Sequence, residues 1–160
     1  MIPINRIFVD MDGVLADFVQ GVQGPKYLNG PLTDNLYDDN KIALSNKGLF
    51  KDLPPMTDMQ DLIDGIKDTG IYWEILTCTG ELNRKKVAQD KTTWIREHVD
   101  PGVVITCTFK GEQKAAYAKP GSVLIDDRPK NINAWIDAGG IGILHTNAAD
   151  TIAQLQDLIN

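Results

Sequence analysis

The chain has 160 residues, of which 42% are apolar and 24% charged, and a formal net charge of −6 at pH 7. This length suits one compact domain with a buried core. The negative charge argues against long nucleic acid or an anionic membrane as the partner, because the field of the protein would repel both. No run reaches the ~18 apolar residues of a membrane span, and the two cysteines show no zinc-type pairing. We expect a cytoplasmic protein.

Apolar segments of strand length alternate with segments of helical spacing along most of the chain. Residues 59–67, for example, place Met59, Leu62, Ile63 and Ile66 on one helical face. Regular alternation of this kind is typical of parallel strands joined by right-handed crossovers, and it predicts a doubly wound, five-stranded α/β sheet. The expected strands are 6–9, 71–76, 103–106, 122–125 and 141–144, and the expected helices are 59–67, 81–99, 113–118, 129–138 and 148–158.

The segment from about residue 19 to residue 56 breaks this alternation. It is rich in glycine and proline and carries an acidic loop at residues 34–39. A connection of this length without secondary structure is unusual unless it is functional. Its apolar residues, among them Tyr37 and Phe50, favour a folded unit over a disordered loop. We interpret the segment as a small cap that is inserted after the first strand and lies over the functional site.

Two sets of carboxylates follow predicted strands. Asp10 and Asp12 come after the first strand, and Asp126 and Asp127 come after the fourth. In an open α/β sheet, ligands bind at the carboxyl ends of the strands. Four carboxylates at this edge would repel one another unless a cation neutralised them. Since acidic oxygen ligands suit Mg²⁺, which also takes substrate phosphate, the pattern predicts a magnesium site for phosphate chemistry.

Four motifs in register resemble those of the haloacid dehalogenase superfamily of phosphatases, and more narrowly those of the 5′(3′)-deoxyribonucleotidases. Residues 10–18 (DMDGVLADF) resemble the first motif, residues 75–77 (ILT) the second, Lys114 the third and residues 124–131 (LIDDRPKN) the fourth. The resemblance covers nearly the whole chain. It implies a Rossmann-like phosphatase fold, Mg²⁺ as cofactor and a small phosphorylated substrate, most plausibly a deoxynucleotide.

The resemblance also implies roles for individual residues. Asp10 would be the nucleophile that forms an aspartyl-phosphate, and Asp12 the general acid and then the general base. Thr77 would hydrogen-bond a phosphoryl oxygen, and Lys114 would offset its charge. Lys110 competes with Lys114, but Lys114 lies in the predicted helix upstream of the acidic pair, as the family lysine does. The Mg²⁺ ligands would come from Asp10, the backbone carbonyl of Asp12, Asp126 and Asp127, and the sequence leaves open which of the last two ligates directly.

Further residues are expected to contact substrate. In the nucleotidases an aromatic residue matching Phe18 lines the base pocket, and Leu49 and Phe50 match a pair in the cap. Leucine at the first position of that pair weakens stacking on a base. Cys78, which follows the second motif, and Arg128, which lies within the fourth, complete the expected substrate-binding set. Two alternatives stay open: a phosphatase for another small phosphomonoester or a polynucleotide 3′-phosphate, and a non-catalytic phosphate-binding module.

Overall fold

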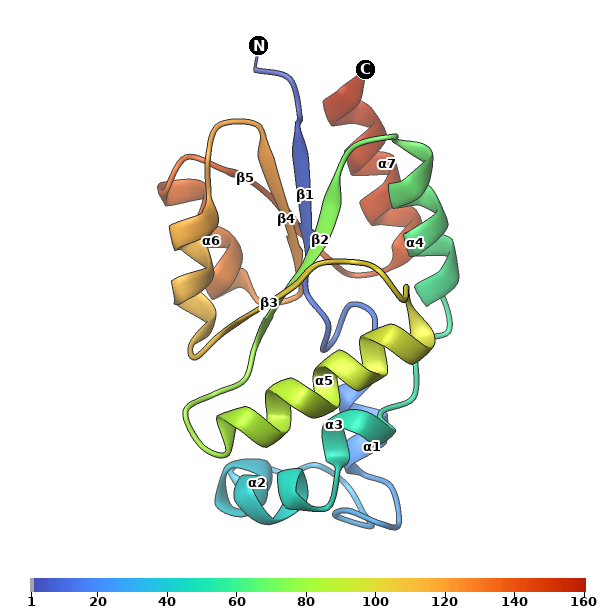
Figure 1. The fold of residues 1–160 in the computed structure, drawn as a ribbon, viewed down its shortest axis with the longest axis vertical. Helices are drawn as coiled ribbons and strands as arrows, with labels where there is room; N and C mark the ends of the chain where they lie inside the picture. The colour runs from blue at the N-terminus through green and yellow to red at the C-terminus, as the bar shows by residue number, and fades with distance from the viewer. Residues whose placement is uncertain (1) are drawn as a thin grey trace.

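Five parallel strands form one sheet in the computed structural model, which describes residues 2–160 (Figure 1). The strand order is β3-β2-β1-β4-β5, so the chain begins at the centre and winds outwards in both directions. This order confirms the predicted doubly wound α/β sheet. The strands are β1 (Arg6–Val9), β2 (Trp73–Cys78), β3 (Ile105–Thr108), β4 (Ser122–Asp126) and β5 (Ile141–Leu144).

Side chains of the three central strands alternate between two hydrophobic cores. The larger core receives Ile7, Val9, Ile75, Val123 and Ile125. The smaller core, on the other face, receives Phe8, Leu76 and Leu124, which pack against Ile132 and Trp135. Because both faces of the sheet are buried, these strands read as continuous apolar runs in the sequence.

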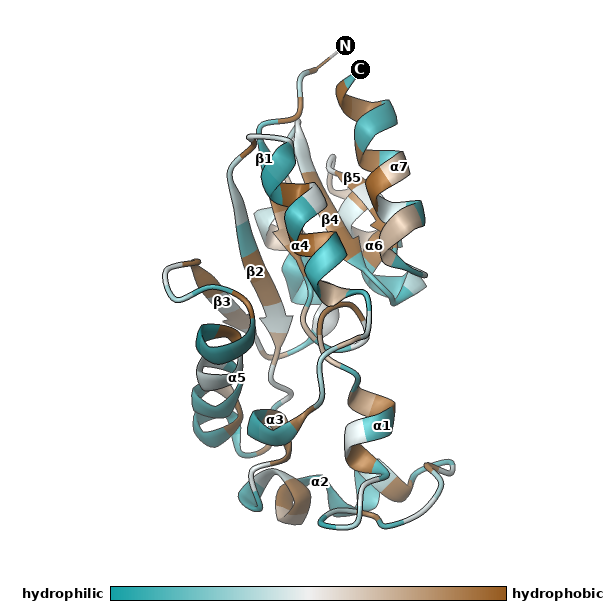
Figure 2. Ribbon diagram, turned by 90° about the vertical axis from the view of Figure 1, so that its right-hand side faces the viewer, coloured by the Kyte–Doolittle hydropathy of each residue, from teal (hydrophilic) through white to brown (hydrophobic). Residues whose placement is uncertain are grey.

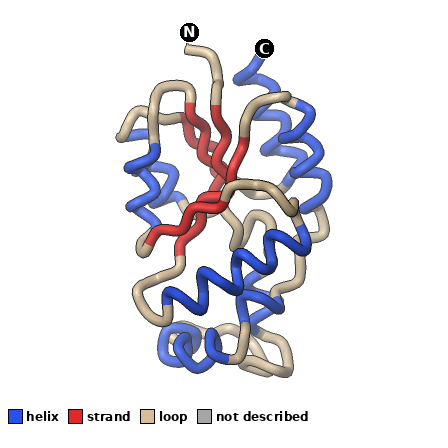
Figure 3. The backbone as a smooth tube through the Cα atoms, in the orientation of Figure 1, coloured by secondary structure: helices blue, strands red, loops and turns tan. Residues whose placement is uncertain are grey.

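Helices cover both faces of the sheet (Figures 1 and 3). From residue 59 onwards the helices are α4 (Met59–Asp68), α5 (Arg84–His98), the 3₁₀ helix η1 (Gly111–Tyr117), α6 (Pro129–Asp137) and α7 (Ala148–Ile159). α4 packs against α7 on one side, whereas α6 packs against η1, β4 and β5 on the other. Figure 2 shows that the central strands are largely hydrophobic, while α5 is largely hydrophilic. Within residues 2–160, no helix is long and apolar enough to cross a membrane.

Some elements begin later than predicted. β2 begins at Trp73 rather than at residue 71, because the Ile71 backbone N–H bonds the Thr69 hydroxyl in the turn that ends α4 (3.1 Å). α5 begins at Arg84, since Asn83 before it adopts a left-handed conformation with φ of 55°. The segment predicted as helix 113–118 forms a 3₁₀ helix instead. β2 also ends later than predicted, at Cys78 rather than at residue 76. Thr77 is therefore the penultimate residue of this strand.

The segment between β1 and α4 lies at the carboxyl ends of the strands (Figure 1). It contains α1 (Phe18–Val22), α2 (Leu36–Asn46) and α3 (Leu49–Asp52). Its two connections to the sheet run side by side: the Asp17 N–H donates to the Pro54 carbonyl, and the Met56 N–H donates to the Leu15 carbonyl, both at 2.8 Å. α3 packs against α5, which brings the segment onto the same edge of the sheet as the acidic residues.

Candidate active site

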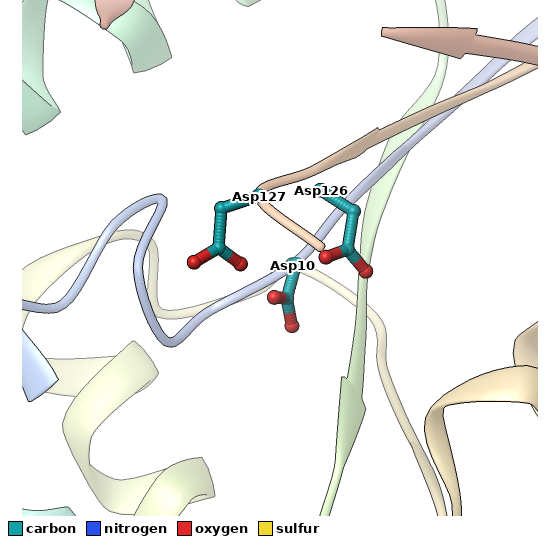
Figure 4. Close-up of side chains that lie close together, drawn as sticks. All are labelled: Asp10, Asp126 and Asp127. Atoms are coloured by element: carbon teal, nitrogen blue, oxygen red, sulfur yellow. The ribbon is translucent and has the colours of Figure 1, made fainter. Parts of the chain in front are cut away.

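Three carboxylates meet where β1 and β4 end (Figure 4). Val9 and Ile125 are register partners in these neighbouring parallel strands, so the next residues, Asp10 and Asp126, emerge side by side. Asp127 follows directly. One carboxylate oxygen from each of the three aspartates lies within 4.8 Å of the others. The register of the sheet therefore creates the acidic cluster that the sequence predicted at this edge.

Lys114 pairs with this cluster from η1. Its side chain is fully buried, and its Nζ donates to Oδ1 of Asp10 (3.0 Å) and to Oδ2 of Asp126 (2.8 Å). Burial alone would lower the pKa of Lys114, but the two carboxylates outweigh burial and raise it above its usual value. The competing Lys110 lies at the surface beside Glu81 (3.5 Å). The geometry thus places Lys114, rather than Lys110, at the cluster.

Asp126 and Asp127 occupy different environments. Asp126 is fully buried, and its carboxylate accepts from Lys114, from the Asn131 amide (3.1 Å) and from the Arg128 backbone N–H (2.9 Å). Asp127 is only partly buried, and its carboxylate lies against the backbone of Gly13. The carboxylate of Asp126 therefore holds neighbouring groups of the site in place, whereas the carboxylate of Asp127 is freer to bind a ligand.

The cluster carries more negative charge than Lys114 offsets. Burial, with the neighbouring charges of Asp126 and Asp12, raises the pKa of Asp10 to about 7 even though Lys114 opposes the shift. Burial and the charge of Asp126 likewise raise the pKa of Asp127 to about 6. Raised pKa values in neighbouring acids follow from burial and from like charges close together, and they are common at functional sites.

Asp12 is held by a residue that the sequence analysis missed. Lys91, fully buried in α5, donates from Nζ to Oδ2 of Asp12 (2.8 Å), to the Thr77 hydroxyl (3.0 Å) and to the Cys78 carbonyl (2.6 Å). Oδ1 of Asp12 is buried and has no hydrogen-bond partner among the residues described. A signal was present in the sequence: Lys91 lies four residues after Val87 and three before Trp94, on the apolar face of the helix.

The expected aromatic residues lie close together, but not as the walls of an open slot. The rings of Phe18 and Phe50 are nearly parallel with centroids 6.1 Å apart, and Tyr37 contacts Phe18 edge-on at 4.9 Å. A base between two rings needs planes about 7 Å apart, which is twice a carbon–carbon contact distance. Phe50 is only 5% exposed, and Leu49 is buried in the core. In this structure Phe18 and Phe50 stack on each other and leave no gap for a base.

The acidic cluster opens into a cavity of about 480 Å³. This volume is in the range of cavities that bind small organic ligands. Neither Asp126 nor Leu49 lines it, and the Cys78 thiol is directed to the Phe109 carbonyl (3.0 Å). Of the residues predicted from the sequence, those that line the cavity are Asp10, Asp12, Phe18, Phe50, Thr77, Cys78, Lys114, Asp127 and Arg128.

The fold is similar to several solved structures. A hydrolase from Pseudomonas syringae has a TM-score of 0.54 at 14% identity, with 98% of this chain and 100% of that chain covered. A hydrolase from Streptococcus pneumoniae TIGR4 has a TM-score of 0.53 at 17% identity, covering 96% and 98%. D,D-heptose 1,7-bisphosphate phosphatase from Burkholderia thailandensis has a TM-score of 0.51 at 11% identity, covering 94% and 84%. At these identities the likeness extends to the fold alone.

A family model gives the more specific comparison. The sequence has no match among curated proteins. Residues 27–154, however, match the family described as 5′ nucleotidase, deoxy (Pyrimidine), cytosolic type C protein. The matched range begins after Asp10 and Asp12. The assignment of the first motif therefore rests on its residue types and on the positions of the two carboxylates, not on the family match. Since the match covers most of the chain, the protein belongs to this nucleotidase family and is a phosphatase of the haloacid dehalogenase type.

Proposed function

We propose that this phosphatase is Mg²⁺-dependent and hydrolyses deoxyribonucleoside monophosphates through an aspartyl-phosphate on Asp10. The observation that carries the proposal is the arrangement of two carboxylates with different partners. Asp10 is held by Lys114. Asp12 is held through one oxygen by Lys91, while its other oxygen has no partner among the described residues. One carboxylate is thus placed to attack, and the other to exchange a proton.

The reaction has two steps. An oxygen of Asp10 attacks phosphorus, the bond from phosphorus to the ester oxygen breaks, and Asp12 gives its proton to the departing alkoxide. Asp12, now ionised, takes a proton from water as the water oxygen attacks phosphorus. The bond from phosphorus to the Asp10 oxygen then breaks, which releases inorganic phosphate, restores the Asp10 carboxylate and leaves Asp12 protonated for the next cycle.

Lys114 and Thr77 stabilise charge during both steps. Lys114 donates to two carboxylates, which leaves one of its three N–H groups for a phosphoryl oxygen. Thr77 lines the cavity, and its hydroxyl oxygen accepts from Lys91, so its proton is free to bond the substrate. Such preorganised donors act strongly in a site from which most water is excluded.

The residues present fit a magnesium ion. Asp10 and Asp127 would supply hard oxygen ligands from neighbouring loops, and the short distances between the carboxylates of the cluster support a cation there. Gly13 makes room for Asp127, because a Cβ at this position would lie 2.1 Å from its Oδ2. We assign Asp10, Asp127 and the Asp12 backbone carbonyl as ligands, and Asp126 as their support. When bound, Mg²⁺ would offset charge on the phosphoryl group.

The substrate class rests on the cavity and on the family. We assign residues 19–56 as a cap that closes over the acidic edge, with Phe18 and Tyr37 offering an apolar surface to the organic part of the substrate. The words "deoxy (Pyrimidine)" in the family description support a deoxynucleotide, and the word "cytosolic" supports a cytosolic site of action. Because Phe18 and Phe50 leave no slot between them, we place the base against the part of Phe18 that lines the cavity.

Replacing Asp10 by Asn should abolish turnover and stabilise the metal-free protein at neutral pH. The folded-state pKa of Asp10 is about 7 against 3.8 for an unperturbed carboxyl, so its contribution to stability is complete below about pH 4 and is lost as pH rises through 7. From about pH 5 to about pH 7.5, the metal-free wild type should lose on the order of 2 kcal/mol relative to Asp10→Asn. Urea unfolding at each pH measures this difference, and parallel pH profiles for the two proteins would contradict it.

Replacing Gly13 by Ala should weaken Mg²⁺ binding about ten- to hundredfold, since displacement of a supporting contact has effects of this size. The new methyl group would displace the Asp127 carboxylate. Gly70→Ala is the matched control: Gly70 has a similar positive φ of 69°, but its Cβ would meet nothing within 4 Å. Isothermal titration with Mg²⁺ should find the control unchanged. Equal losses in both variants would mean that backbone strain, rather than Asp127, is responsible.

Replacing Asp12 by Asn should slow the first step by ~10²–10⁴ for an alkyl phosphate, which is the usual contribution of a general acid. An aryl phosphate has a leaving group that departs without protonation, so its first step should slow much less. Rapid-quench measurement of the first step separates the two substrates. The same loss for both would show that Asp12 is not the acid.

Deoxynucleoside monophosphates should be hydrolysed about fivefold more efficiently than ribose 5-phosphate. Stacking on an aromatic contributes roughly 1–3 kcal/mol per base. Contact with Phe18 alone, rather than with two rings, places this protein at the low end, which is about fivefold in kcat/KM. Phe18→Ala should remove the preference, whereas Tyr72→Ala, which removes an exposed aromatic outside the cavity, should not. If ribose 5-phosphate matches every nucleotide in the wild type, a sugar-phosphate phosphatase replaces the nucleotidase assignment.

A further inference from the structure

Lys91 is a buried cation that neither attacks the substrate nor transfers a proton in the two proposed steps. It is only 1% exposed and lies on the side of α5 that faces the cavity. Its ion pair with Asp12 joins residues 79 positions apart in the sequence. Burying a lysine is costly unless its charge is paired and its donors are satisfied. The burial of a lysine beside the proposed general acid therefore calls for an explanation in terms of the groups that it contacts.

The hydrogen bonds of Lys91 separate its role from that of Lys114. An ammonium group has three N–H donors, and Lys91 uses three, on Asp12, Thr77 and the Cys78 carbonyl. Lys91 could bond a phosphoryl oxygen only by giving up one of these partners. Lys114 makes two such bonds and keeps one donor free. The hydrogen bonds of Lys91 thus hold groups of the protein, whereas Lys114 keeps one donor for the substrate.

The bonds of Lys91 also fix which oxygen of Asp12 is available. Lys91 occupies Oδ2, so Oδ1 is the oxygen left to carry and exchange a proton. The Thr77 hydroxyl, held by the same ammonium group, is oriented together with Asp12. One side chain from α5 therefore sets the positions of two groups on two different strand ends.

Lys91 is covered by an aromatic residue of the segment that we assign as the cap. Its Nζ lies over the ring of Phe50, 4.9 Å from the centroid. An ammonium group over an aromatic face is attracted by the ring quadrupole, most strongly where water is excluded. Phe50 is 5% exposed and stacks on Phe18, so its ring makes its contacts within the protein. Its position suits shielding of the Lys91–Asp12 pair better than stacking on a base.

We propose that Lys91 is the positioning residue of the general acid, and that Phe50 keeps the Lys91–Asp12 pair in place by covering it. The cap would then govern proton transfer by Asp12 through Lys91, without Phe50 touching substrate. This inference rests on the proposed function, because it takes Asp12 to be the acid of the first step.

The test compares Lys91→Met with the wild type on one alkyl and one aryl phosphate. Methionine keeps the length of the side chain but removes the charge and all three donors. A misplaced catalytic group costs about a hundredfold, so the first step should slow about a hundredfold for the alkyl phosphate and less than about tenfold for the aryl phosphate, with KM little changed. Lys85→Met is the matched control, since Lys85 lies on the same helix but is exposed to solvent. It should behave as the wild type.

Two results would overturn the inference. Equal slowing of both substrates would show that Lys91 supports the site in general, and a raised KM with an unchanged first step would show that it binds substrate. Failure of the proposed function looks different, because the wild type itself would then form no phosphoryl-enzyme with either ester.

Phe50→Leu provides a second route if Lys91→Met does not fold. Leucine keeps an apolar side chain over Lys91 but removes the aromatic face. We expect a several-fold slowing of the first step that is selective for the alkyl phosphate and equal for a nucleotide and ribose 5-phosphate. A raised KM for nucleotides alone would make Phe50 a base-binding residue and overturn its assignment as the cover of Lys91.

Discussion

The site depends on burying carboxylates at the carboxyl ends of two neighbouring strands without leaving them unpaired. An isolated buried carboxylate costs several kcal/mol or takes up a proton. The chain meets this constraint with two buried lysines, one for each of the two carboxylates that we propose to be catalytic. Lys114 crosses from η1 to Asp10 and Asp126, and Lys91 crosses from α5 to Asp12. The remaining negative charge, on Asp10 and Asp127, is what a cation would neutralise.

The two lysines also divide the proposed chemistry between two sides of the sheet edge. On one side, Asp126 accepts three donors and fixes Lys114 beside the nucleophile. On the other, Lys91 fixes the acid and meets the aromatic ring of Phe50. The packing of α3 onto α5 thus completes the side of the proposed acid, while the side of the proposed nucleophile is complete within the sheet and its own connections.

The sequence predicted the parts of this arrangement that follow from local patterns. Apolar runs located the strands, and the acids that follow those runs placed Asp10 and Asp126 at one edge, because parallel strands end together. The spacing of Lys91 from Val87 and Trp94 indicated that it lies on the buried face of its helix, but its partner could not be predicted. Only the fold brings Lys91 to Asp12. The contact of Phe18 with Phe50 could not be predicted either, since residues 19–56 show no periodicity from which to infer how they pack. The identity of Lys114 was predicted, but its bond to Asp126 appears only in the structure.

The central claim is that Asp10 carries the phosphoryl group between the two steps. Acid quenching during turnover of a phosphomonoester with Mg²⁺, followed by proteolysis and mass spectrometry, tests it most directly. The account predicts one phosphoryl group on the peptide that contains Asp10, present in the wild type and absent from Asp10→Asn. A phosphoryl group on any other residue would contradict it. So would turnover by the wild type with no phosphorylated peptide, if the peptide is also missing when an aryl phosphate reacts with Asp12→Asn, whose dephosphorylation is slowed.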